Sequence, residues 1–227
     1  MAMTFLQLAA RLRQEVCGAG TGPTAVTNQT GESKRIVDWI ASADEEVQQE
    51  HDGWRFMVGN FTLNTVAADG SYAASDFVTP VTDLRQFREK TLKIYLLSAG
   101  VSGESRLTYM DYDQWEAAYN IGTQTSNRPT HFTVGNDMSL KLWPIPDAIY
   151  RVSGEYQKSV TTLSASSDTP NYPSEYHMLP VYRGMMKYGR YAGAMEVYSD
   201  GERMYRWMLR KMERTQLPRI AMAGALA

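Results

Sequence analysis

The stretch LWPIPDAIYRVSGEYQ, residues 142–157, joins a proline-rich corner to a segment in which polar and apolar residues alternate. This two-residue period is typical of a half-buried β-strand, because successive strand side chains point to opposite faces of a sheet. Leu140 and Leu142 alternate with a lysine just before the corner. Proline fixes φ and lacks a backbone donor, so we interpret residues 144–148 as the rigid connection of a β-hairpin. The residues that hold this predicted hairpin in one direction are Trp143, Pro144, Pro146, Asp147 and Tyr150.

The composition indicates a soluble globular protein of one large domain or two small ones. The chain has 227 residues, of which 43% are hydrophobic and 21% charged, so it can bury a core and is not a disordered chain. The net charge of −2 argues against a dedicated nucleic-acid-binding protein, which normally carries a basic excess. Cys17 is the only cysteine, which excludes an internal disulfide and a cysteine metal cluster and favours a reducing compartment.

The sequence shows no pattern of export or membrane insertion. Its first residues, MAMTFLQLAARLRQEV, are too charged for a signal peptide. No apolar run approaches the ~18 residues that a membrane-spanning helix requires. We therefore expect a protein that has no membrane partner and is soluble and cytosolic when made.

Helical periodicity marks both ends of the chain. Thr4 and a glutamine three residues later form a capping box that opens a predicted helix over residues 4–17. A second helix is predicted over residues 31–51. Two further helices, over 174–197 and 200–216, are predicted near the end of the chain and are joined at the sequence YSDGE.

Opposite charges line these predicted helices. The exposed face of the helix over 31–51 is acidic, with Glu32, Asp38, Asp44, Glu45, Glu46 and Glu50. The C-terminal pair of helices is basic, with Arg183, Lys187, Arg190, Arg203, Arg206, Arg210, Lys211 and Arg214. We expect residues 1–56 and 171–227 to form one helical-bundle domain in which the two faces pair. Contact of the basic pair with DNA or with an acidic neighbouring protein is the alternative.

The centre of the chain, residues 57–170, is predicted to be a β-rich module. Its alternating segments are bounded by turn residues, which favours an antiparallel sandwich or a barrel-like sheet. The predicted strands are 55–66, 77–82, 92–98, 106–110, 131–135, 139–143 and 149–158. A short helix is predicted over 112–121, and the small-residue stretch 67–75 is predicted to be an exposed loop. The fold class is therefore α+β, a helical bundle with an inserted antiparallel β-sandwich or barrel-like module.

No residue cluster in the sequence predicts an enzyme, a cofactor or a metal site. His51, His131 and His177 lie far apart and share no ligand spacing. The DYD motif at residues 111–113 resembles a metal-holding aspartate pair, but it also has the form of a capped helix start. The GAGTG stretch at residues 18–22 follows a helix rather than a strand, which argues against a dinucleotide-binding loop.

The order and spacing of these signals resemble the adaptor proteins, or head-to-tail connectors, of tailed bacteriophages. The similarity begins in residues 3–57, where a short helix and a Gly/Pro/Thr loop lead into a helix followed by HDGWRF. It continues in RPTHFTV (128–134), in LKLWPIPDAIYRVSGEYQ (140–157) and in SSDTPNYPSEYHMLPVYRGM (166–185). The aromatic-Pro-x-Pro-Asp-x-x-Tyr strand pair, followed by Asp-x-Pro and Pro-x-x-Tyr-His, is the most specific part. Residues 60–110 carry little resemblance.

The resemblance implies a structural protein of the virion with no enzymatic activity and no cofactor. Twelve copies would form a ring beneath the portal protein, at the head–tail junction, and would join the capsid to a tail, nozzle or tail-completion protein. Double-stranded DNA would pass through the ring without sequence-specific binding. The near-neutral charge agrees with this, because a lumen that gripped phosphates would oppose ejection. Assembly would take place in the host cytoplasm.

Within that role, the C-terminal hairpin and tail are predicted to dock on the portal. The tail, residues 217–227, is small, apolar and proline-led, so we expect it to become ordered against a partner protein. The predicted portal-docking residues are Arg203, Arg206, Arg210, Arg214, Leu217, Pro218, Arg219, Ile220, Met222 and Leu226. The loop predicted to face the tail contains Asp69, Gly70, Ser71 and Tyr72.

Two other classes of protein share this composition. Another virion ring protein, such as a stopper or a tail terminator, would make different contacts. A non-viral β-sandwich binding module would be a stable monomer with a concave aromatic patch, and the many tyrosines make carbohydrate its expected ligand.

Overall fold

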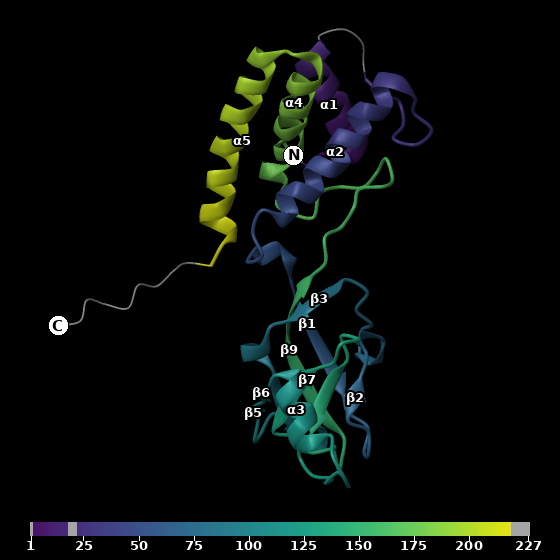
Figure 1. Ribbon diagram of the computed structural model, residues 1–227, viewed down its shortest axis with the longest axis vertical. Helices are drawn as coiled ribbons and strands as arrows, with labels where there is room; N and C mark the ends of the chain where they lie inside the picture. The colour runs from purple at the N-terminus through teal and green to yellow at the C-terminus, as the bar shows by residue number, and fades with distance from the viewer. Residues whose placement is uncertain (1, 18–21, 219–227) are drawn as a thin grey trace, which may run out of the picture. The chain divides into compact units, whose positions relative to one another are not determined.

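The chain folds into two compact units, which a computed structural model describes for residues 2–17 and 22–218. The first unit is Met1–Phe56 together with Val160–Ala227, and the second is Met57–Ser159. Among the described residues, the four longest helices belong to the first unit and the strands belong to the second (Figure 1). The two sheets do not close into a barrel, and the predicted α+β fold class is confirmed.

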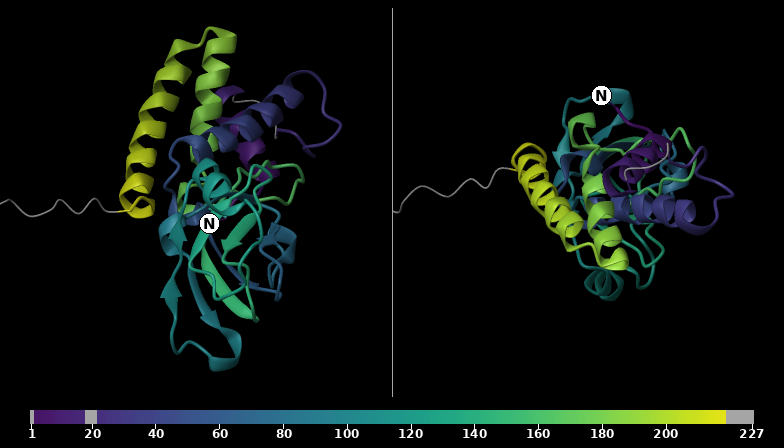
Figure 2. Two further views of the ribbon diagram at one scale, coloured as in Figure 1. Left: turned by 60° about the horizontal axis from the view of Figure 1, so that its bottom comes forward. Right: turned by 90° about the horizontal axis from the view of Figure 1, so that it is seen from above.

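Helix α4 (Leu179–Ala192) is the centre of the helical unit and packs against the other three long helices there. These are α1 (Phe5–Cys17), α2 (Gly31–Gln49) and α5 (Met195–Gln216). Figures 1 and 2 show α2 and α5 on different sides of α4. The main core of this unit contains Phe5, Leu8, Leu12, Ile36, Ile40, Val181 and Met185.

Two predicted helix starts are confirmed by their capping hydrogen bonds. The backbone N–H of Thr4 donates to the Gln7 side chain (3.0 Å), and the Gln7 N–H donates to the Thr4 hydroxyl (3.3 Å). These two bonds form the reciprocal capping box. It supplies acceptors to two backbone N–H groups at the helix start that have no acceptor within the helix. Helix α3 (Tyr112–Tyr119) begins after Asp111, whose carboxylate accepts from the N–H of Asp113 (3.2 Å). The DYD motif is thus a helix cap.

The junction between the last two helices differs from the prediction. Helix α4 ends at Gly193, which adopts the left-handed conformation (φ 67°) and donates its N–H to the Gly189 carbonyl. The sequence YSDGE lies inside α5, so the predicted break there is wrong. A Cβ on Gly201 would lie 2.9 Å from the Tyr182 carbonyl oxygen and from Met185 Cβ. This glycine therefore permits close helix contact rather than a turn.

A buried polar network joins α2 to the segment that precedes α4. The Tyr172 hydroxyl donates to Asp44 (2.8 Å), and Gln48 Nε2 donates to the same carboxylate (2.8 Å). Gln48 also exchanges two hydrogen bonds with the backbone of Thr161 (2.8 and 2.9 Å). Because these groups are withdrawn from water, each needs a protein partner, and the network supplies it.

The larger sheet of the second unit is built around β9 (Tyr150–Lys158). Strand β1 (Val58–Asn64) pairs with β9 along seven residues. Strands β3 (Leu84–Phe87) and β4 (Lys93–Leu96) pair with different ends of β9, and β5 (Ser105–Arg106) extends the sheet beyond β4. All these pairs are antiparallel. A strand over 77–82 does not form; β3 follows that segment instead.

The smaller sheet has the order β2 (Ser71–Tyr72), β8 (Leu140–Trp143), β7 (His131–Val134) and β6 (Thr108–Tyr109). Strands β6 and β7 are parallel, whereas the other pairs are antiparallel. One core contains side chains from both sheets, including Phe61, Leu63, Ile94, Phe132, Leu140, Leu142 and Val152. The two sheets therefore bury their apolar faces in a shared interior, as in a sandwich.

The proline corner connects these two sheets and does not form a hairpin, so that part of the prediction is wrong. Strand β8 pairs with β7 and β2, whereas β9 belongs to the other sheet. Backbone hydrogen bonds tie the corner to neighbouring loops. The Ile145 N–H donates to the Thr125 carbonyl (3.1 Å), and the Ala68 N–H donates to the Pro146 carbonyl (2.8 Å). Alternation reveals which face of a strand is buried, but it does not name the partner strand.

The corner side chains are nevertheless held firmly. The Tyr150 hydroxyl donates to Asp147 (2.7 Å), and the Trp143–Pro144 peptide bond is cis. The Trp143 ring stacks on Tyr119 of α3, with 3.8 Å between ring centroids. The corner thus fixes α3 on the outside of the smaller sheet as well as redirecting the chain.

Candidate docking surfaces

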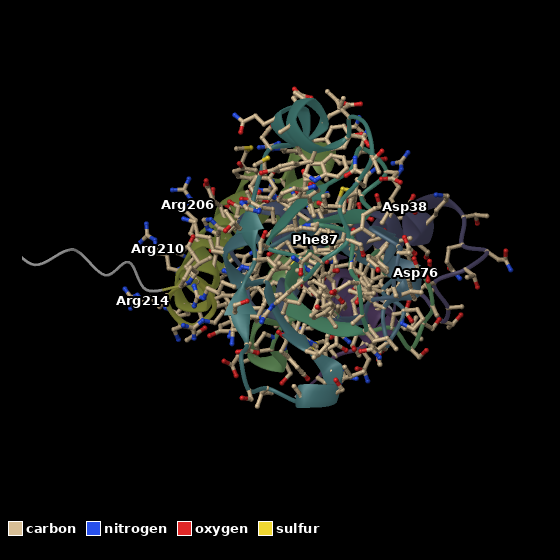
Figure 3. All side chains as sticks on the ribbon, turned by 90° about the horizontal axis from the view of Figure 1, so that it is seen from below. Asp38, Asp76, Phe87, Arg206, Arg210 and Arg214 are labelled. Carbon is tan, nitrogen blue, oxygen red and sulfur yellow. The ribbon has the colours of Figure 1, made fainter. Side chains whose placement is uncertain are left out.

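The outer face of α5 brings together the predicted portal-docking arginines. They follow one stripe of the helix, because their spacings of three and four residues match its period. A groove of about 480 Å³ on this face is lined by Arg203, Arg206, Trp207, Arg210, Lys211 and Arg214. Figure 3 shows Arg206, Arg210 and Arg214 on the outer side of α5, pointing away from the helix. The buried residues on the opposite face are Gly201, Tyr205, Leu209 and Met212.

The arginines of this groove differ in their partners. Arg203 pairs with Asp200 (2.9 Å) and Arg206 with Glu202 (2.6 Å), both within α5. Both arginines of these pairs are largely exposed, so each pair stabilises the helix by little. The two arginines nearer the C-terminus, at positions 210 and 214, form no ion pair with a described residue. Half of the stripe therefore has unpaired positive charge.

Trp207 is the groove residue that the sequence analysis missed. Its side chain is 50% exposed, and Lys211 Nζ lies 3.6 Å from the centroid of its ring, a cation–π contact. The signal was present in the spacing, because Trp207 lies four residues after Arg203 and three before Arg210. A stripe of arginines at helical spacing should therefore be examined for the aromatic residues that share it.

The described part of the chain ends just beyond α5. The Leu217 N–H donates to the Glu213 carbonyl (3.0 Å), which closes the last turn of the helix. Pro218 lies beside Gly53, since a Cβ at that glycine would be 3.6 Å from the proline ring. The remaining predicted docking residues, Arg219, Ile220, Met222 and Leu226, lie outside the described residues.

Other basic residues of the C-terminal helices are used inside the unit. Arg183 Nε and Lys187 Nζ lie 2.5 and 2.7 Å from the carboxylate of Glu46 on α2. Burial raises the pKa of Glu46, but hydrogen bonds from Lys187 and Arg183 outweigh it and the pKa is lowered. The expected pairing of the acidic and basic helices is confirmed for these residues. It does not extend to the stripe on α5.

The loop predicted to face the tail is exposed only in part. Asp69 and Ser71 are exposed, and the Asp69 carboxylate accepts from the Ser71 N–H (3.0 Å). Tyr72 is buried in the core, so its predicted exposure is wrong. Its hydroxyl donates to the Asp69 carbonyl (2.5 Å), and burial raises its pKa to about 12. The aromatic ring buries apolar surface while its hydroxyl closes the loop, a combination that composition alone did not reveal.

The histidines stand apart and have separate partners. His51 Nε2 lies 2.9 Å from Glu213, and His131 Nδ1 lies 2.9 Å from the Thr130 hydroxyl. His177 is buried and bonds to backbone atoms on both sides of its ring. Within residues 2–17 and 22–218, no three His, Cys, Asp or Glu side chains are grouped so that they could hold a metal ion.

Exposed arginines around a tryptophan, on a fold of two small units, are typical of proteins that act by binding other macromolecules. Comparison with known families identifies which family of such binding proteins the chain belongs to. The model of the SU10 adaptor protein family matches residues 3–224, so the chain belongs to that family. No curated protein matches the sequence. The resemblance to phage head-to-tail adaptors is therefore confirmed, and the chain is a structural phage protein of the virion.

Membership of an adaptor family indicates a structural role rather than a catalytic one. It also implies association with other phage head–tail proteins. In the part of the chain that the structure covers, no helix has both the length and the apolar character needed to cross a bilayer.

Proposed function

We propose that twelve copies of this chain form a ring beneath the portal at the head–tail junction and join the capsid to the tail. The family match over residues 3–224 carries this proposal. The ring encloses part of the DNA channel, and the chain has no enzymatic activity and requires no cofactor. Its partners are the portal, a tail, nozzle or tail-completion protein, and other copies of itself.

The portal-side contact is assigned to the C-terminal region. The stripe on α5 is exposed, and the described chain leaves the end of that helix at Leu217 and Pro218. An exposed helix continued by an apolar segment offers charged anchors and a hydrophobic extension to one partner. The helical unit, Met1–Phe56 with Val160–Ala227, is therefore assigned to the portal side.

The β-rich unit, Met57–Ser159, is assigned to the tail side. The exposed part of its loop, Asp69 to Ser71, provides the contact, and the buried ring of Tyr72 anchors it. The net charge of −2 supports a channel that lets DNA slide, because few released counterions mean weak retention of the duplex.

The native mass of the protein, alone and mixed with portal rings of the same phage, tests this proposal. We expect one ring of adaptor on each portal, measured by native mass spectrometry. A protein that leaves the portal mass unchanged would overturn the portal-adaptor assignment. Binding to isolated tail tubes instead would favour a stopper or a tail terminator.

A further inference from the structure

The groove on α5 has a definite chemical character. Five cationic side chains and one half-exposed indole line it, and it lies on the face opposite the buried residues of the helix. A guanidinium presents a planar fork of donors that matches a carboxylate in two parallel hydrogen bonds. Arg210 and Arg214 are exposed and have no described carboxylate to pair with. The groove is therefore ready to accept acidic groups from outside the chain.

The exposed indole requires that the partner supply apolar surface as well as negative charge. Trp207 leaves half of its surface in water, although it is the largest apolar side chain of the groove. Lys211 lies over its ring and keeps a positive charge at the centre of the stripe. Tryptophan and arginine are two of the residues most enriched where interfaces gain their binding energy, in the centre of a patch that excludes water.

We propose that this groove binds an acidic segment of a partner protein that carries one apolar side chain. Its carboxylates pair with Arg210 and Arg214, and its apolar side chain covers Trp207. This inference deepens the proposed function and rests on it only for the identity of the partner, which is the portal.

A protein segment fits the groove better than nucleic acid does. The chain as a whole carries a net charge of −2, whereas duplex-binding surfaces usually carry a large basic excess. An indole amid arginines is, in contrast, ordinary at the centre of a protein interface.

Two synthetic peptides test the chemistry without the portal. One consists of glutamates around a central leucine, and the other has glutamate in place of the leucine. We expect the wild-type chain to bind the leucine peptide about threefold more tightly, and Arg210→Glu/Arg214→Glu to weaken both peptides about tenfold. Trp207→Ala should remove the preference for leucine. The matched control is Lys90→Glu/Arg106→Glu, which changes the charge equally at exposed positions of the other unit.

Each result decides the inference. The inference would be overturned if the Arg210→Glu/Arg214→Glu variant bound each peptide as tightly as the wild-type chain does. Tighter binding of a 20-base-pair duplex than of either peptide would assign the groove to nucleic acid instead. Self-association that the same variant abolishes would assign it to a second copy. Portal rings are then added: peptide binding without portal binding rejects the proposed function alone, whereas portal binding that the variant leaves unchanged rejects the groove.

Discussion

Tyr172 donates a 2.8 Å hydrogen bond to Asp44, and both side chains are buried in the helical unit. Burial raises the pKa of Asp44 to about 6, although hydrogen bonds from Tyr172 and Gln48 act to lower it. With no cation among the causes of the shift, desolvation dominates and the neutral acid is favoured. The folded helical unit is therefore more stable when this carboxyl is protonated, because burial penalises its charge.

Asp44→Asn should change how stability depends on pH. Because the pKa of Asp44 is raised from 3.8 to about 6 in the folded state, that state binds more protons than the unfolded chain between these values. The contribution of protonated Asp44 to the free energy of unfolding is full below pH 3.8. It is lost as the pH rises through 6, a change of about 3 kcal/mol. Urea unfolding at pH 4, 5, 6 and 7 should show wild type losing most of this amount, about 2.4 kcal/mol, relative to Asp44→Asn. Parallel pH profiles would contradict the assignment.

Glu46→Gln should have the opposite pH signature. Its pKa is lowered in the folded state, so the carboxylate stabilises the fold above its unfolded pKa and the contribution disappears as the pH falls through the folded value. About a third of the Glu46 side chain is exposed, and water screens its pairs with Arg183 and Lys187. We expect a loss of about 1 kcal/mol at pH 7 in urea unfolding, and little difference at pH 3. A larger effect at pH 3 than at pH 7 would be inconsistent with this pairing.

Gly59→Ala should destabilise the β-rich unit. A Cβ at this position would lie 2.5 Å from the ring of Tyr156 on the neighbouring strand, closer than atoms can approach. The ring is itself held by the hydrogen bond from its hydroxyl to Asp83 (2.9 Å). Overpacking of this kind costs about 1–3 kcal/mol, which exceeds the usual gain from replacing glycine in a strand.

The measurement is thermal unfolding followed by near-ultraviolet circular dichroism. Gly53→Ala is the matched control, because its Cβ would find its nearest neighbour at 3.6 Å, an ordinary contact. A Gly59→Ala protein as stable as this control would show that Tyr156 moves aside at no cost.

Arg128→Ala should loosen the hairpin formed by β4 and β5. Arg128 Nη2 lies within hydrogen-bond distance of the Ile94 carbonyl (3.2 Å), the Gly103 carbonyl (2.7 Å) and the Ser105 hydroxyl (2.8 Å). Its removal leaves these acceptors without a charged donor, at a cost of about 1–3 kcal/mol. Amide hydrogen exchange over residues 97–106 should accelerate. Arg88→Ala, which removes only an exposed ion pair, should leave that exchange unchanged.

Deletion of residues 217–227 tests the C-terminal docking assignment. The removed segment follows the last turn of α5, so the helical core should remain intact. We expect loss of portal binding in sedimentation with portal rings, together with a far-ultraviolet spectrum like that of wild type. Retention of portal binding by the shortened chain would overturn the assignment of portal docking to this segment.

Local signals in the sequence were sufficient for much of the fold. The capping box at Thr4 and the aspartate before α3 each satisfy backbone groups of their own helix, so their effect is legible without the rest of the chain. The alternation around Leu140 and after Tyr150 likewise identified β8 and β9 as strands with one buried face. Family membership was visible because the motifs that resemble the family occur along almost the whole chain, and the family model matches residues 3–224.

The sequence by itself determined the class of fold, the helix starts and the buried faces, since periodicity and capping act between residues close along the chain. Only the tertiary structure decided which strands pair across the proline corner and that Tyr72 is buried. It also separated the arginines that α2 neutralises, such as Arg183, from Arg210 and Arg214, which α5 presents to solvent. The physical reason is that burial and charge pairing depend on neighbours far along the chain, which a residue's own periodicity does not identify.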